Sequence, residues 1–266
     1  MTVLTQAAAD GMVVAKRNLI KVKRIPDLLI FTTIQPVMFV LLFAYVFGGA
    51  IHPDGVNYRE FLMAGIFTQT VAFGSAITAI GLADDIQKGI IDRFRSLPMA
   101  RSAVLVGRTT SDLFNNVIVM VVMSLCGLIV GWRIHRGFGY ALLAYAVMFA
   151  FAFALSWVSA TIGLSVRSVE VAQSAGFIWL FPVTFLSNAF VPTGTLPGWL
   201  QGVANWNPVS AVVAAARELF GNTGVVEPHR PWPMTHPVIT ALGWSALLLV
   251  IFIPLSVRKY RAAAAR

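Results

Sequence analysis

The residues of this sequence that are best suited to chemistry are its histidines and its few carboxylates. His52, His135, His229 and His236 lie too far apart to supply the short-spaced ligand pairs of a zinc site. The sequence contains no His-Glu-x-x-His or Gly-x-Ser-x-Gly motif, and no Gly-x-x-x-x-Gly-Lys-Ser/Thr loop for nucleotide phosphates. We therefore expect no catalytic residue, no metal site and no cofactor on this chain.

Six charged residues of both signs lie in segment 84–98, Asp-Asp-Ile-Gln-Lys-Gly-Ile-Ile-Asp-Arg-Phe-Arg-Ser-Leu-Pro. Ile86, Ile90, Phe94 and Leu97 recur at helical spacing, and charges of both signs surround this stripe. A loop that only joins two helices needs about four or five residues. The segment therefore predicts a short amphipathic helix that another protein contacts from the cytoplasm. A helix lying passively in the membrane interface is the alternative.

The composition shows that most of the chain around these charged residues is apolar. Of the 266 residues, 58% are hydrophobic and 12% are charged, whereas soluble domains carry about 25% charged residues. The mean hydropathy is +0.77, so the chain needs a bilayer and is not an ordinary soluble enzyme. Six stretches without charge each reach the length of about 20 residues that crosses the hydrocarbon core. We predict an all-α integral membrane protein, one permease-like domain over 1–266, with transmembrane helices at 28–50, 60–83, 113–132, 139–165, 174–191 and 237–257.

The basic residues predict the orientation of these helices. Lys and Arg are concentrated in 1–27 and 258–266, which places both termini in the cytoplasm and requires an even number of crossings. All but five of the 20 Lys and Arg residues are then cytoplasmic. The net charge of +9 is therefore explained by topology and by contact with anionic membrane lipid, and nucleic acid is not an expected partner. We expect a multi-pass protein of the plasma membrane with N-in and C-in topology.

Segment 1–27 repeats apolar residues on one helical face, opposite Arg17, Lys21 and Arg24. A basic amphipathic helix of this kind is typical of the membrane interface. A solvated basic tail is the alternative.

Segment 192–224 is interrupted by Pro and Gly, which predicts that it does not cross the membrane. We expect two external half-helices, 198–205 and 210–220, that cover the outer end of a pathway as a gate. The gate candidates are Trp199, Trp206 and Pro208. Anchoring of the two indole rings among lipid headgroups is the alternative.

The predicted spans contain neutral polar and aromatic side chains but no carboxylate at mid-membrane depth. Arg108 and Asp112, four residues apart, are expected to pair on the helix surface at the start of the third span. The missing intramembrane charges argue against a stand-alone carrier or channel. A cavity lined by aromatic residues suits a bulky hydrophobic or lipid-like compound, although the same stripe would serve simple packing. The substrate-pathway candidates are Gln35, Tyr45, Gln69, Phe73, Phe177, Phe181, Phe185 and Asn188.

Two motifs carry a resemblance to a known family. Asp85 is followed by Gly-Ile-Ile-Asp-Arg-Phe-Arg at 89–95 and by Pro98, and Leu-Ser-Asn-Ala-Phe-Val-Pro at 186–192 is followed by Pro-Gly-Trp-Leu at 197–200. These motifs resemble drug-export permeases of the daunorubicin-resistance type, in the second class of ABC exporter permeases. The chain departs from the usual family pattern by carrying Asp in place of Glu at both acidic positions and Ile90 in place of Thr.

The resemblance implies the membrane-spanning subunit of an ATP-driven exporter of hydrophobic drugs or lipid-like compounds. Export of a cell-envelope glycolipid or polysaccharide by the same architecture is the alternative. It further implies a second permease copy or paralogue, and an ABC ATPase subunit that binds ATP and Mg²⁺. Segment 84–98 would be the coupling helix that docks on this ATPase, through Asp85, Ile86, Lys88, Gly89, Ile90, Asp92, Arg93, Phe94, Arg95 and Pro98.

Overall fold

The computed structural model describes residues 26–47, 57–90, 103–224 and 231–263, and throughout these ranges the regular structure is helical. The predicted all-α class is therefore confirmed for this part of the chain. The elements are α2 (Pro26–Leu42), η1 (Phe43–Phe47), α3 (Tyr58–Gln87), α5 (Ala103–Val130), α6 (Phe138–Gly163), α7 (Val169–Phe185), η2 (Thr193–Thr195), α8 (Gly198–Trp206), α9 (Pro208–Phe220), α10 (Trp232–Thr235) and α11 (Pro237–Ala263).

Among the described residues, four helices are long and apolar enough to cross a membrane, namely α3, α5, α6 and α11. Two shorter apolar helices, Ile34–Val46 and Val169–Phe185, accompany them. Helices of this composition in one chain are those of a multi-pass membrane protein.

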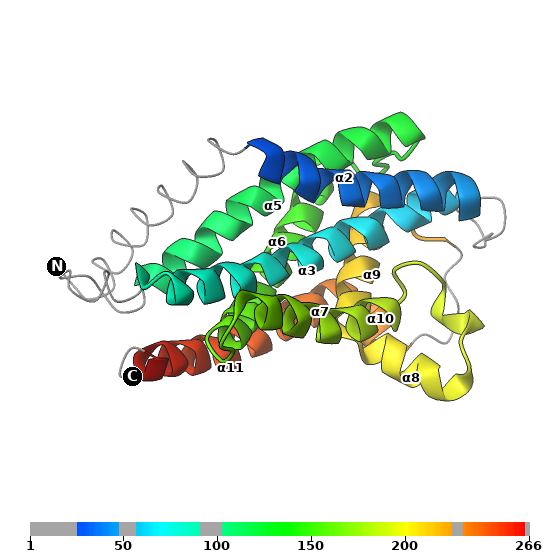
Figure 1. Ribbon diagram of the computed structural model, residues 1–266. Helices are drawn as coiled ribbons and strands as arrows, with labels where there is room; N and C mark the ends of the chain where they lie inside the picture. The colour runs from blue at the N-terminus through cyan, green and yellow to red at the C-terminus, as the bar shows by residue number, and fades with distance from the viewer. Residues whose placement is uncertain (1–25, 48–56, 91–102, 225–230, 264–266) are drawn as a thin grey trace.

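Helix α3 is the centre of the bundle (Figure 1). It packs against α5, α6, α7 and α9, and its residues from Phe61 to Ala72 are all buried. Small residues allow these close approaches: a Cβ at Gly163 of α6 would lie 2.5 Å from the carbonyl oxygen of Ala79 in α3. In the view of Figure 1, α2 and α5 lie above α3, whereas α7 and α11 lie below it.

Several described helices begin or end at other residues than the predicted spans. The first span was expected at 28–50, but the α-helix α2 ends at Leu42 and continues as the π-helical turn η1. The third begins ten residues before the expected 113, at Ala103, because charged Arg108 and Asp112 are accommodated inside α5. The fifth was expected at 174–191, but α7 spans Val169–Phe185, with Ser168 capping its start and Pro182 in its last turn.

The two predicted half-helices form close to their expected positions, as α8 and α9. Asn207 separates them: its Oδ1 accepts from the N–H of Val209 at 2.8 Å, while its Nδ2 donates to the carbonyl of Val183 at 2.7 Å. Gly221 ends α9 in the left-handed conformation that a C-cap favours. Helix α9 packs against α3, α6 and α11, whereas the main contacts of α8 are with α9, η2 and α10, and α8 projects from the bundle in Figure 1.

The prediction that 84–98 forms one helix is wrong for its first residues. Asp84 to Gln87 are the last turn of α3, and Lys88 and Gly89 form a turn in which Gly89 has a φ of 63°. A positive φ stops an α-helix, and glycine adopts it without steric cost. Residues 91–98, with Asp92, Arg93, Phe94, Arg95 and Pro98, lie outside the described residues, as does the predicted interfacial helix up to residue 25.

Candidate substrate cavity

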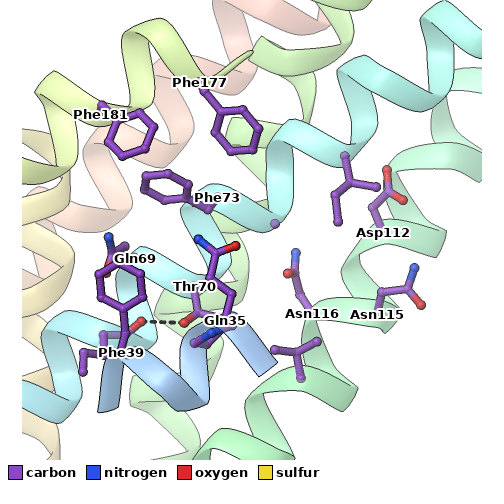
Figure 2. Close-up of a pocket in the computed structure, with 15 residues that line it drawn as sticks. Gln35, Phe39, Gln69, Thr70, Phe73, Asp112, Asn115, Asn116, Phe177 and Phe181 are labelled. Atoms are coloured by element: carbon purple, nitrogen blue, oxygen red, sulfur yellow. Dashed lines mark hydrogen bonds between the residues drawn. The ribbon is translucent and has the colours of Figure 1, made fainter. Parts of the chain in front are cut away.

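A cavity of about 230 Å³ opens between α2, α3, α5 and α7. Figure 2 shows its aromatic side and its polar side facing each other. Five of the eight pathway candidates line it, and they come from three different helices. The complete lining is Gln35, Pro36, Phe39, Ile66, Gln69, Thr70, Phe73, Gly74, Ile77, Asp112, Asn115, Asn116, Val119, Phe177 and Phe181.

Three phenylalanines form the aromatic wall. The ring of Phe73 lies edge-on to Phe181, with centroids 5.1 Å apart, and 5.7 Å from the ring of Phe177. Phe177 and Phe181 are one turn apart on α7, with centroids separated by 6.2 Å. Pairs at such distances favour edge-to-face or offset contacts, and they present flat apolar surfaces to a guest molecule.

Asp112 occupies the opposite end of the cavity as part of a buried ion pair. Its Oδ2 accepts a 2.6 Å hydrogen bond from the hydroxyl of Thr78 and lies 3.2 Å from Nε of Arg108. Arg108 also donates to the carbonyl of Ile77 at 3.1 Å, and its guanidinium fills the space where a Cβ at Gly81 would lie. The expected surface pair is therefore wrong: Asp112 is only 4% exposed and lies inside a helix long enough to span the membrane.

Asn115 and Asn116 follow Asp112 on α5, and both line the cavity. They were not among the predicted pathway residues, and neither were Thr70 and Phe39 on the neighbouring helices. One sequence signal could have indicated a polar face of α5: polar residues recur every four positions, at Arg108, Asp112 and Asn116.

Three pathway candidates lie elsewhere. Tyr45 is 61% exposed, and its ring lies 5.0 Å from the guanidinium of Arg59. Phe185 stacks on both Phe181 and Phe190 beyond the cavity. Asn188 is buried after α7, where its backbone N–H donates to the hydroxyl of Ser210 at 3.0 Å.

Arg217 of α9 is a buried arginine that was not among the residues singled out from the sequence. It is 5% exposed. Its Nε donates to the carbonyl of Phe61 at 2.9 Å, and its Nη2 donates to those of Asn188 and Ala189 at 2.8 and 3.0 Å. Its guanidinium also covers the ring of Phe61 at 3.4 Å. Arg217 therefore attaches the segment after α7 to the start of α3 and to α9.

The three gate candidates lie on two helices that differ in burial. Trp199 and Trp206 are 75% and 57% exposed on α8. Pro208 is half-buried at the first position of α9, where its fixed φ suits a helix start. The two indole rings therefore lie away from the core that α9 enters.

The coupling candidates that the structure describes lie at the end of α3. Asp85 is buried, whereas Lys88 is exposed and pairs with Asp84 at 2.7 Å. Ile86, Gly89 and Ile90 are half-buried. Within the described part of the chain, no three His, Cys, Asp or Glu side chains are grouped as a metal site would require.

Comparison with known proteins identifies the family. The model of the ABC-2 type transporter family matches residues 11–220. The daunorubicin resistance ABC transporter permease protein DrrB1 of Streptomyces coeruleorubidus is 34% identical over 245 residues, which cover 92% of this chain and 83% of that protein.

More distant relatives agree with this match. The probable doxorubicin resistance ABC transporter permease protein DrrC of Mycobacterium tuberculosis is 26% identical, over 86% of this chain and 80% of its own length. A putative transport permease, ycf38, of Porphyra purpurea is 27% identical, over 88% of this chain and 79% of its own length. The resemblance drawn from the two motifs is thereby confirmed, and the chain belongs to the ABC-2 type transporter family.

Proposed function

We propose that this chain is the membrane-spanning subunit of an ATP-driven exporter that moves hydrophobic drugs or lipid-like compounds out across the plasma membrane. The observation that carries the proposal is the cavity between α2, α3, α5 and α7, with a phenylalanine wall on one side and amide side chains on the other. Such a lining suits an amphipathic guest with few charges. The relatives named for daunorubicin and doxorubicin resistance favour a drug over a glycolipid or polysaccharide.

The energy for transport comes, in this proposal, from an ABC ATPase subunit that binds ATP and Mg²⁺. Two permeases, either two copies of this chain or one copy and a paralogue, pair with the ATPase subunits. Segment 84–98 is the docking element. Exposed Lys88 at the end of α3 is available for such a contact, whereas buried Asp85 belongs to the fold.

Co-purification with the host ATPase, followed by measurement of drug-stimulated ATP hydrolysis in lipid nanodiscs, tests the assignment. Lys88→Glu should lower the stimulation several-fold, because a reversed charge opposes the complementarity of the docking surfaces. Arg258→Glu is the matched control, since Arg258 is also an exposed basic residue near a helix end but belongs to α11. Unchanged stimulation in Lys88→Glu, or an equal loss in the control, would contradict docking through 84–98.

The proposed topology has six spans, with residues 1–27, 84–102, 167–170 and 258–266 in the cytoplasm and 51–58, 132–137 and 192–236 outside. The short apolar helices α2 and α7 supply the two crossings beyond the four long ones. Cys126 is the one cysteine of the sequence, so it is first replaced by serine. Single cysteines are then introduced and labelled with an impermeant reagent to test this arrangement. Labelling should occur at position 223 but not at position 262 in intact cells, and labelling of 262 from outside would contradict the six-span topology with both termini in the cytoplasm.

Helices α8 and α9 are proposed to gate the outer end of the pathway. Cysteines placed along 197–220 should change their accessibility to an impermeant reagent when ATP is trapped on the partner subunit. Equal labelling in both states would contradict gating and leave Trp199 and Trp206 as lipid anchors, because exposed indole rings favour the headgroup level.

A further inference from the structure

Asn116 lines the cavity with an unused hydrogen-bonding group. The residue is 5% exposed, and its Nδ2 has no hydrogen-bond partner among the residues that the structure describes. The neighbouring Asn115 also lines the cavity, and its Oδ1 lacks a partner in the same part of the chain. A buried donor or acceptor without a partner costs free energy, so native proteins rarely retain one without a reason.

The residues packed around Asn116 do not provide its Nδ2 with a hydrogen-bond acceptor among the described residues. Its Oδ1 occupies the space where a Cβ at Gly74 would lie, so the amide is held against α3. The nearest carboxylate along the helix, Asp112, is already engaged by Thr78 and Arg108. Figure 2 shows the side chain of Asn116 projecting from α5 toward α3, across the cavity from the phenylalanine rings.

We propose that Asn116, assisted by Asn115, forms a hydrogen-bonding subsite that selects substrates whose aromatic body carries a carbonyl or hydroxyl group on its edge. The aromatic body lies against Phe73 and Phe181, and the oxygen of the substrate accepts a hydrogen bond from Nδ2 of Asn116. Because Asp112 is paired with Arg108, recognition is by neutral hydrogen bonds and not by a charge. This inference rests on the proposed function, since it assumes that the cavity holds substrate.

Two pyrene probes of similar size test the subsite. 1-Acetylpyrene carries a carbonyl group on its ring edge, whereas 1-ethylpyrene lacks it. Binding is measured as saturable energy transfer from protein tryptophan to pyrene in nanodiscs, with empty nanodiscs as the background. The wild-type chain should bind the acetyl compound about 3- to 10-fold more tightly, as one neutral hydrogen bond allows.

Substitution then assigns the preference to one residue. Asn116→Leu keeps the volume but removes the donor, and it should abolish the preference, so that 1-acetylpyrene binds no more tightly than 1-ethylpyrene. Asn116→Thr restores a donor and should restore part of the preference. A preference that persists in Asn116→Leu, or wild-type binding of both probes with equal affinity, would overturn the subsite while leaving the cavity as a binding site. If neither probe binds saturably, the proposal that the cavity is a binding site is refuted, and the proposed subsite with it.

Discussion

Removing the charge of Asp112 should destabilise the fold far more than removing that of Asp84. Each carboxylate pairs with a basic residue four positions away on the same helix, Arg108 and Lys88 respectively. The two pairs differ in burial. The side chains of Arg108 and Asp112 are 15% and 5% exposed, whereas those of Lys88 and Asp84 are 59% and 29% exposed.

The magnitudes follow from this difference. In Asp112→Asn the amide oxygen still accepts from Thr78, but the buried guanidinium of Arg108 loses its counter-charge. Breaking one side of a buried pair costs about 3–5 kcal/mol. Because Arg108 also donates to the carbonyl of Ile77, we expect the lower end, about 3 kcal/mol, or roughly a 150-fold change in the unfolding equilibrium. Asp84→Asn should cost about 0.3–0.5 kcal/mol, as exposed helix pairs do.

Unfolding by sodium dodecyl sulfate in mixed micelles, followed by circular dichroism, provides the free energies of unfolding. The double variant Arg108→Met/Asp112→Asn should be less destabilised than the sum of its single variants by about 2 kcal/mol, because the second substitution removes the charge that the first leaves unpaired. Two results would refute the reasoning: additivity of the single variants, or a cost of Asp112→Asn within 0.5 kcal/mol of that of Asp84→Asn.

Three further substitutions test other contacts by the same unfolding measurement. Arg217→Met should cost about 3 kcal/mol, because it leaves three buried carbonyls without their charged donor, whereas exposed Arg136→Met should stay within about 0.5 kcal/mol. Gly65→Val should cost about 3 kcal/mol or more, since its Cβ would overlap the backbone carbonyl of Ala189, which cannot rotate away. Gly89→Ala should cost about 1 kcal/mol through its positive φ, as no atom of the described residues lies within 4 Å of the added Cβ, and Gly89→Asn should cost less. A neutral effect of Arg217→Met, Gly65→Val or Gly89→Ala would contradict the contact or conformation from which that prediction is derived.

The helical class, the approximate positions of the long spans and the break after α7 could be predicted from the sequence. These features depend on local properties: the length of an apolar stretch and the inability of Pro and Gly to continue a helix. The C-cap Gly221 is one such local signal, and the structure confirms the end of α9 there. The two motifs were also sufficient to indicate the family.

The burial of Arg217 and Asp112 and the meeting of four helices around the cavity were decided only by the tertiary structure. In a water-soluble helix the apolar stripe marks the face that packs on the protein. In a bilayer the lipid-facing side is as apolar as the packed side, so the hydrophobic pattern does not reveal which face meets a neighbouring helix. Exposed Val121 and buried Met123 on α5 are both apolar, for example. Which polar side chains become buried, and which share one cavity, therefore depends on the contacts of α3 with the helices around it.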